Sequence, residues 1–382
     1  MTGARTDPYR NPGAIHWRTE PVAGVAGFHR SLPGYAVTRL VPVPGLAREL
    51  GVRRVFVKEE ASRLGLPAFK VLGASYAVSR ALSERYGAGG GRALPLDELR
   101  AAAAAHDPVE LIAATDGNHG RAVARFARLL GLPSRIFFPA GLSAAASSAL
   151  AAEATEVVEL GRSYDGVVLA AQQAAASAGD AALLIQDTSW PGYEQIPQWI
   201  TDGYATLFHE ASEQLAAAGA GSPGLVAVPV GVGALAHAAV RHYRSGGAEG
   251  SAAGGTAPAA PTVLSVEPSN APAVLSSLHA GRAVTVPTAP TIMAGLNCGT
   301  PSASAWPALR AGLDAAVAVT DGEAAQAVRD LEAAGVDAGP CGAAALAGVR
   351  ALARTGPLAA DTTVLLLSTE GRAANPLPGG TA

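Results

Sequence analysis

The sequence predicts an α/β protein with two doubly wound parallel-sheet domains. The chain has 382 residues, which suits two domains or one large α/β unit. Hydrophobic residues make up 49% of it, so it can bury a sizeable core. Short, continuous apolar runs alternate with helical stretches, which is typical of parallel strands covered by helices on both faces.

The expected elements follow one another along the chain as strands separated by helices. The first strand is expected at residues 54–57 and a helix at 69–86. The next strands are expected at 111–115, 134–138, 156–160 and 181–186, and helices at 96–105, 120–130, 143–154 and 164–178. After an aromatic-rich segment, 190–208, we expect strands at 225–230, 263–267, 315–320 and 363–367, and a helix at 234–243.

This order of elements suggests that one domain is inserted into the other. We expect residues 1–90 and 196–382 to form a large domain, and residues 91–195 a small inserted α/β domain. The Gly/Ala/Pro-rich stretch 246–261 is expected to be a surface loop.

Composition and charge exclude several classes of protein. No apolar run approaches the ~20 residues of a membrane-spanning helix, and the first residues lack the apolar stretch of a signal peptide. The net charge of −3 argues against a nucleic-acid partner. Two cysteines, Cys298 and Cys341, cannot build a disulfide framework. We therefore expect a cytoplasmic protein with neither a nucleic-acid nor a membrane partner.

The chain contains only two lysines, Lys58 and Lys70. Lys70 lies at the start of the apolar helix, where burial and the helix dipole would lower the pKa of its amine. Such an amine is suited to Schiff-base formation; the alternative is a lysine that reaches out to solvent. Lys58 adjoins Glu59 and Glu60, so an ion pair is expected there.

Two turns join strands to helices and could bind a ligand. Residues 115–120 offer backbone N–H groups and the side chain of Asn118, although an ordinary capped turn has the same sequence features. His119 could be purely structural. The second turn, Gly231-Val232-Gly233-Ala234-Leu235, lacks the third glycine and the acidic residue of a dinucleotide fingerprint. It therefore suits a single phosphate better than a pyrophosphate.

Polar side chains also stand at the carboxyl ends of two expected strands. Asp187 could be a pocket carboxylate or a helix cap, and Ser368 and Thr369 place hydroxyl groups after the last strand. The sequence shows neither the His and Cys spacing of a metal site nor the glycine-flanked serine of a hydrolase.

Together these features suit pyridoxal phosphate: an amine for the aldehyde, an Asn-bearing turn, a cradle for one phosphate and a hydroxyl for the ring nitrogen. The chain resembles the diaminopropionate ammonia-lyases, fold-type-II enzymes of the tryptophan synthase β-like group that are related to serine/threonine dehydratases. The stretches that carry the resemblance are 63–73, 114–120, 186–203, 266–268, 291–299 and 368–371. The block Q-D-T-x-W-x-G-Y-E-x-I-P, which begins at Gln186, separates this family from generic dehydratases.

The resemblance implies a role for each candidate residue. Lys70 would bind the cofactor aldehyde, Asn118 its phenolic oxygen and residues 231–235 its phosphate. Ser368, with Thr369 nearby, would contact the ring nitrogen. The family's substrate-facing carboxylates correspond to Asp116 and Asp187, and a homodimer is implied.

Four departures from the family pattern bear on the substrate. Pro67 replaces a usual Asn, and Glu59-Glu60-Ala61 replaces Asp-Glu-Ser. Residues 338–342 read A-G-P-C-G in place of the common S-G-E-S-G, which removes an acid near the cofactor. Arg372 stands where the family tends to have Asp.

The expected reaction is β-elimination from 2,3-diaminopropionate, a small amino acid, to pyruvate and ammonia. The first alternative is a serine or threonine dehydratase or a β-replacement enzyme that uses the same cofactor. The second alternative, from another class, is a protein that binds pyridoxal phosphate without turnover.

Overall fold

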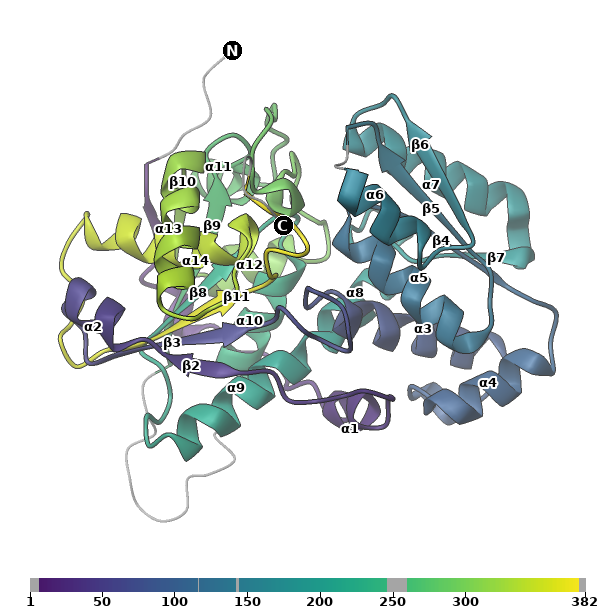
Figure 1. Cartoon of the computed structure of the whole chain (residues 1–382), viewed down its shortest axis with the longest axis horizontal. Coiled ribbons are helices and arrows are strands. Elements are labelled where there is room, and N and C mark those ends of the chain that lie inside the picture. The colour runs from purple at the N-terminus through teal and green to yellow at the C-terminus, as the bar shows by residue number, and fades with distance from the viewer. Residues whose placement is uncertain (1–6, 116, 142–143, 246–259, 378–382) are drawn as a thin grey trace. The chain divides into compact units, whose positions relative to one another are not determined.

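The computed structural model describes residues 7–115, 117–141, 144–245 and 260–377 (Figure 1). Asp116 and most of the loop expected at 246–261 lie outside the described residues. The chain divides into two compact units. The larger unit comprises residues 1–23, 37–62 and 207–382, and the smaller unit residues 24–36 and 63–206.

The larger unit is built on a seven-stranded sheet. Its strand order is β1-β10-β9-β8-β11-β3-β2, and its five inner strands run parallel. The strands are β1 (Tyr9–Arg10), β2 (Leu40–Pro42), β3 (Arg54–Glu59), β8 (Leu225–Pro229), β9 (Thr262–Pro268), β10 (Ala315–Val319) and β11 (Thr363–Ser368). The helices are α2 (Pro44–Leu50), α9 (Ala205–Ala217, from Leu207 onward), α10 (Ala234–Arg244), α11 (Ala273–Ala280), α12 (Trp306–Gly312), α13 (Asp321–Ala333) and α14 (Pro340–Ala353).

The core of the larger unit lies around its central strands. Every residue of β8 and β11 is buried, which explains their continuous apolar sequences. Helix α14 is rich in alanine and buries most of its side chains, so it lies within the core rather than on the surface.

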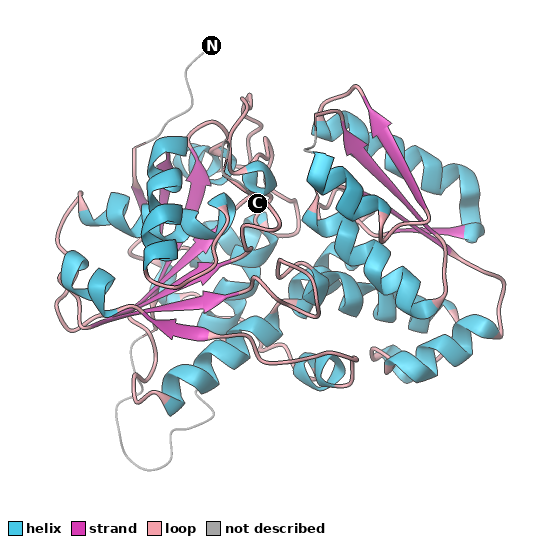
Figure 2. Cartoon of the chain, viewed as in Figure 1, coloured by secondary structure: helices cyan, strands magenta, loops and turns pink. Residues whose placement is uncertain are grey.

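The smaller unit is built on a four-stranded, wholly parallel sheet of order β6-β5-β4-β7. Its strands are β4 (Glu110–Ala114), β5 (Ser134–Pro139), β6 (Glu156–Leu160) and β7 (Ala182–Leu184). Its helices are α1 (Val25–Arg30), α3 (Val71–Arg85), α4 (Leu96–Ala104), α5 (Asn118–Leu130), α6 (Ala144–Ala151), α7 (Tyr164–Ala178) and α8 (Gln195–Gly203). Figure 2 shows the strands of each unit as one group in magenta with helices around them.

The α/β class and the parallel sheets predicted from the sequence are confirmed. Two edge strands differ from the expectation: β1 pairs with β10, and β2 with β3, in the antiparallel sense. Antiparallel strands at the edge of a parallel sheet are common in α/β proteins. The aromatic segment 190–208, for which no element was expected, contains helix α8 and the start of α9.

The borders of the two compact units differ from the domain borders that were expected from the sequence. Helix α3 belongs to the smaller unit, although it precedes the predicted insertion at 91–195, because it packs against α5 and α8. The predicted domain borders therefore stay a prediction.

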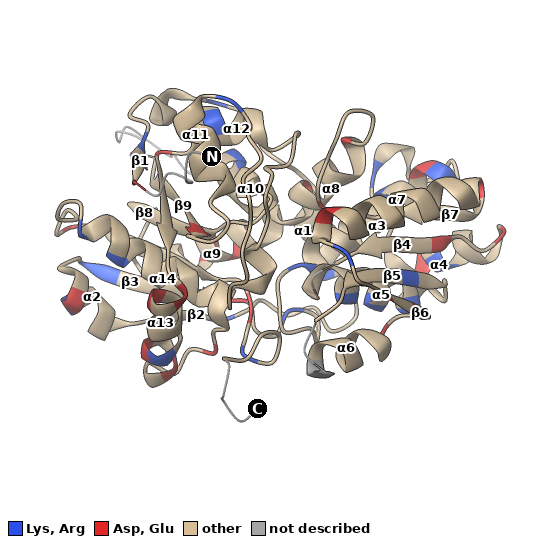
Figure 3. Cartoon of the chain, turned by 90° about the horizontal axis from the view of Figure 1, so that it is seen from above, with Lys and Arg blue, Asp and Glu red and all other residues tan. Residues whose placement is uncertain are grey.

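Charges of both signs are interspersed along the helices of both units (Figure 3). Among the described residues, no helix is long and apolar enough to cross a membrane.

Candidate active site

Lys70 directly precedes helix α3, at the helix start expected from the sequence. Its Nζ donates a 2.6 Å hydrogen bond to Oδ2 of Asp187. The Lys70 side chain is 19% exposed and that of Asp187 is 5% exposed. The amine is therefore partly accessible, and its charge is balanced by a buried carboxylate.

Lys58 is wholly buried in the larger unit. Its Nζ donates hydrogen bonds to Glu210 Oε2 at 2.7 Å, Gln214 Oε1 at 2.9 Å and the Thr38 carbonyl at 2.9 Å. The expected ion pair is present, and it includes Glu210, 152 residues further along the chain. These three bonds match the three hydrogens of an ammonium group, so Lys58 is not an available nucleophile.

Asp187 lies shortly after β7, in the loop that leads towards α8. Burial alone would raise the pKa of this carboxyl, but the nearby charges of Lys70 and His119 and the hydrogen bond from Lys70 outweigh that effect. The pKa falls from its ordinary value of 3.8 to about 2. Asp187 is thus ionised at neutral pH despite being buried.

The turn between β4 and α5 is fixed by a side chain at the strand end. Thr115 Oγ1 accepts hydrogen bonds from the backbone N–H groups of Gly117 at 2.8 Å and Gly120 at 2.9 Å. Asn118 is then the first residue of α5 and is partly exposed. Asp116, the other carboxylate expected to face the substrate, lies outside the described residues.

His119 lies closer to Asp187 than its position in the sequence indicated. Its ring is 2% exposed, and Nε2 lies 2.8 Å from the carbonyl oxygen of Ile185. Its Nδ1 lies 4.0 Å from Asp187 Oδ2. The sequence does not reveal this contact, because it depends on how the end of β7 lies beside α5.

The glycine turn of the larger unit joins β8 to α10, as expected. Gly233 has φ +100°, which favours glycine, and a Cβ there would lie 2.5 Å from Leu309 Cδ1. A Cβ on Gly231 would lie 3.1 Å from Cys298 Sγ. The N–H groups in the first turn of α10 have no partners within the helix. The turn therefore offers backbone N–H donors that no side chain of Gly231 or Gly233 covers.

Ser368 ends β11 and is buried, and Thr369 follows it, also buried. A Cβ on Gly342 would lie 2.7 Å from Ser368 Oγ, so α14 approaches this hydroxyl closely only because it has glycine there. Strands β8 and β11 are parallel neighbours. Ser368 and the Gly231 turn therefore lie at the same edge of the sheet.

Two of the departures from the family sequence, the Pro340 turn and Arg372, have local partners in the structure. Glu370 is 2% exposed, and its Oε1 accepts a 3.2 Å hydrogen bond from the backbone N–H of Cys341, in the first turn of α14. A buried carboxylate therefore lies beside the Pro340 turn even though that turn carries no acid of its own. Arg372 forms ion pairs with Asp337 and Glu332.

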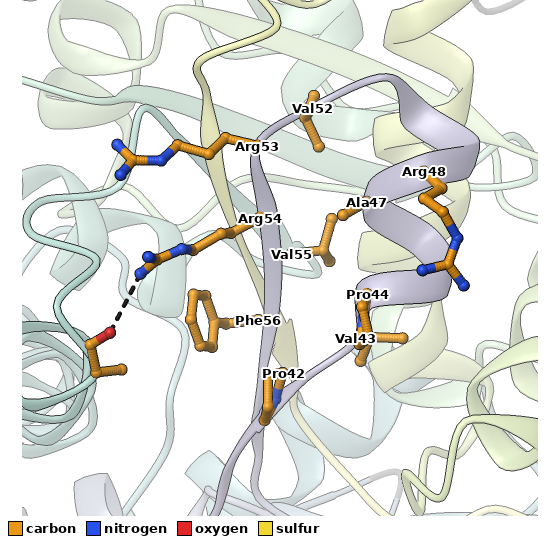
Figure 4. A pocket seen from close by; sticks show the side chains of 11 residues that line it. Pro42, Val43, Pro44, Ala47, Arg48, Val52, Arg53, Arg54, Val55 and Phe56 are labelled. Carbon is orange, nitrogen blue, oxygen red and sulfur yellow. Dashed lines mark hydrogen bonds between the residues drawn. The ribbon is translucent and has the colours of Figure 1, made fainter.

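A pocket of about 590 Å³ lies elsewhere in the larger unit, at the amino end of β3 (Figure 4). Arg48, Arg53 and Arg54 line it, together with apolar side chains. Arg54 pairs with Thr363, at the opposite end of β11 from Ser368. Five residues of strand span roughly 16 Å, so this pocket is separate from Ser368 and the glycine turn.

The donor groups suit pyridoxal phosphate. Lys70 supplies a partly accessible amine, the glycine turn leaves backbone donors free of side chains for one phosphate, and Ser368 supplies a buried neutral hydroxyl. Lys70, Asp187 and His119 come together in the smaller unit, and the turn and Ser368 share a sheet edge in the larger unit.

Comparison with known proteins gives the same class. The family model described as "Pyridoxal-phosphate dependent enzyme" matches residues 32–370, so the chain belongs to this family and pyridoxal phosphate is its cofactor. Within the family, the chain is similar to the diaminopropionate ammonia-lyase of Salmonella typhimurium strain LT2. The two are 35% identical over 318 residues, which are 80% of this chain and 74% of that protein.

Solved structures of Escherichia coli diaminopropionate ammonia-lyase share the fold. A complex with D-serine has a TM-score of 0.85 and 30% identity, covering 97% of this chain and 95% of that one. A complex with an aminoacrylate-PLP azomethine reaction intermediate has a TM-score of 0.83, with the same identity and coverage. The chain is thus a PLP-dependent lyase of fold type II.

Proposed function

We propose that this protein removes the β-amino group from 2,3-diaminopropionate and yields pyruvate and ammonia. The observation that carries the proposal is the Lys70–Asp187 pair, in which an amine donates to a buried, ionised carboxylate 2.6 Å away. The β-substituent of this substrate leaves as an amine, and its protonated form is a cation. A fixed carboxylate binds such a leaving group better than it binds hydroxide.

Each candidate residue has a distinct task in this proposal. Lys70 Nζ, once it is neutral, takes the proton from the substrate Cα, and Asp116 would do so from the opposite face for a D-substrate. Asp187 holds the β-ammonium group and exchanges protons with it. Asn118 and Ser368 orient the ring of the cofactor, and the backbone of Gly231, Val232, Gly233, Ala234 and Leu235 holds its phosphate.

When bound, pyridoxal phosphate supplies an electron sink for the charge that develops at Cα. The Ser368 hydroxyl is neutral, so it does not stabilise a protonated ring nitrogen as a carboxylate would. This favours elimination over transamination. The overall balance is one diaminopropionate and one water giving one pyruvate and two ammonia.

The test supplies purified protein and pyridoxal phosphate with D- and L-diaminopropionate separately, and measures pyruvate. Serine and O-acetylserine are run in parallel, and Lys70→Ala is the matched inactive control. We expect pyruvate from at least one diaminopropionate enantiomer, a slower rate with serine, and loss of activity in Lys70→Ala by a factor of at least about 10².

Faster turnover of serine or O-acetylserine would move the assignment to a dehydratase or a β-replacement enzyme. Absence of turnover with every substrate, although the protein binds the cofactor, would support a binding protein instead.

We further propose that the enzyme works as a homodimer in the cytoplasm. Its two cysteines, Cys298 and Cys341, are buried thiols that are not joined in a disulfide, which suits a reducing compartment. Light scattering on the purified holoenzyme measures the mass directly, and the mass of a monomer would contradict the dimer.

A further inference from the structure

His119 has a defined protonation state in the smaller unit. Its Nε2 lies 2.8 Å from the Ile185 carbonyl oxygen. A carbonyl can only accept, so Nε2 carries the hydrogen and the neutral ring has its lone pair on Nδ1. Burial is the main cause that holds the pKa of His119 below its ordinary value of 6.5, so the ring is neutral near pH 7.

The other ring nitrogen, Nδ1, is a buried base. His119 Nδ1 has no hydrogen-bond partner among the described residues. It lies 4.0 Å from Asp187 Oδ2, which is too long for a hydrogen bond and places a lone pair beside a carboxylate oxygen. A buried polar atom without a partner is destabilising, so its retention calls for an explanation.

Asp187 Oδ2 connects this base to the nucleophile. The same oxygen accepts the 2.6 Å hydrogen bond from Lys70 Nζ. Among the described residues, two tyrosines also interact with this pair: Tyr204 with Lys70 and Asp187, and Tyr193 with Asp187. Burial raises the pKa of both phenols, so both stay neutral. Lys70 and His119 therefore both lie close to one carboxylate oxygen.

We propose that His119 is the positioning residue that takes the proton released by Lys70, through Asp187. The proton leaves Lys70 Nζ, Asp187 remains a carboxylate, and Nδ1 of His119 gains one proton. The positive charge moves from the ammonium to the imidazolium, and the total charge is unchanged. The inference rests on the proposed function in that Lys70 is taken as the amine that reacts with the cofactor.

This arrangement would let Lys70 act as a nucleophile near neutral pH. An unperturbed lysine titrates near 10.4, so only a small fraction is neutral at pH 7. A base that receives this proton through Asp187 removes it as the amine reacts, an effect worth roughly 10²–10⁴-fold. The contribution of His119 should therefore be large near neutral pH and small near pH 10, where hydroxide removes the proton instead.

The test measures how fast the full-length apoprotein captures pyridoxal phosphate, by absorbance, from about pH 6.5 to about pH 10. His119→Gln keeps an amide N–H for the Ile185 carbonyl but has no titratable nitrogen. His106→Gln is the matched control, because His106 is exposed just after α4 in the same unit. Borohydride reduction and peptide mapping report where the cofactor is attached; with two lysines in the chain, one of them wholly buried, the assignment is unambiguous.

We expect capture by His119→Gln to be roughly 100-fold or more slower than wild type near pH 7 and within about twofold near pH 10. His106→Gln should follow wild type throughout. An equal loss at every pH would mean that His119 is merely structural, and no loss at any pH would mean that it plays no part. Either result overturns the proposal.

A second measurement uses the wild-type protein only, so it does not depend on whether a variant folds. Histidine ¹⁵N signals of the wild-type protein are followed with and without pyridoxal phosphate, and we expect one buried imidazole to become protonated on both nitrogens when the cofactor is bound. An unchanged set of signals contradicts the transfer. Wild-type turnover of diaminopropionate is measured separately. The proposed function can therefore fail while the pH-dependent effect of His119 is observed, and the effect of His119 can be absent while diaminopropionate is turned over.

Discussion

At Asp187, a single buried carboxylate oxygen lies no more than 4.0 Å from two nitrogen bases. The oxygen that binds Lys70 at 2.6 Å also lies 4.0 Å from His119 Nδ1. A buried charge is tolerated only when it is paired. Asp187 therefore holds the resting charge of Lys70, and in the proposed reaction it would hold that of the leaving ammonium.

Asp187→Asn separates these two tasks. The amide keeps the shape of the side chain but has no negative charge to offer a cation. We expect turnover of diaminopropionate to fall by roughly 10²-fold or more, and turnover of serine to fall less, because the β-substituent of serine is not a cation. The ratio of the two kcat/KM values is the measurement.

Asp165→Asn is the matched control, since Asp165 is an exposed acid on α7 of the same unit. It should leave both rates unchanged. Equal losses of kcat/KM on both substrates in Asp187→Asn would mean that Asp187 acts only by binding Lys70 and does not bind the leaving group.

The sequence predicted the individual residues of this site better than their contacts. A lysine before a helix and an acid after a strand are local features, and both are where they were expected. The bond between Lys70 and Asp187 joins positions 117 residues apart, and no local pattern encodes it. The same is true of His119, which could be placed on α5 from the sequence but not beside Asp187.

Helix α3, which begins at Lys70, is held by a close approach to α8. A Cβ on Gly73 would lie 2.8 Å from the Ile200 carbonyl oxygen and 2.6 Å from Tyr204 Cε1. The carbonyl belongs to the backbone of α8 and cannot move independently. Glycine at position 73 therefore sets how closely the two helices pack, and with it the position of Lys70.

Gly73→Ala should lower the free energy of unfolding by about 1–3 kcal/mol through overpacking. Urea denaturation at a fixed concentration of pyridoxal phosphate measures the change. Gly27→Ala in α1 is the control: no heavy atom lies within 4 Å of its added Cβ, so stability should stay the same or rise by up to about 1 kcal/mol. Equal stability of Gly73→Ala and wild type would show that the α3–α8 contact can relax.

Helices and strands were predictable from the sequence where their own residues show a recognisable apolar pattern. Strands β8 and β11 are buried on both faces and read as continuous apolar runs. Strand β1 has only two residues, and its partner, β10, lies some 300 positions later in the chain. Helix α14 was missed because it is apolar all round, so it lacks the alternation of apolar and polar faces that marks a surface helix.

Over the whole molecule, buried ionisable groups act on stability in opposite directions. Burial lowers the pKa of His237 to about 4, so the folded protein keeps it neutral while the unfolded chain protonates it below about pH 6.5. Its contribution to stability is complete above pH 6.5 and is lost as the pH falls towards 4. Burial raises the pKa of Glu267 to about 8, so its contribution is complete below about pH 4.5 and is lost as the pH rises through 8.

These opposing effects partly cancel in the wild-type profile, so the contribution of His237 has to be read as a difference. Glu267 is the same in wild type and in His237→Gln, and its effect drops out when the two are compared. Between pH 7 and pH 5 the buried histidine should cost wild type about 2 kcal/mol relative to the variant. Urea midpoints at the two pH values, with pyridoxal phosphate held constant, measure this, and parallel profiles would show that His237 is protonated in the folded protein as readily as in the unfolded chain.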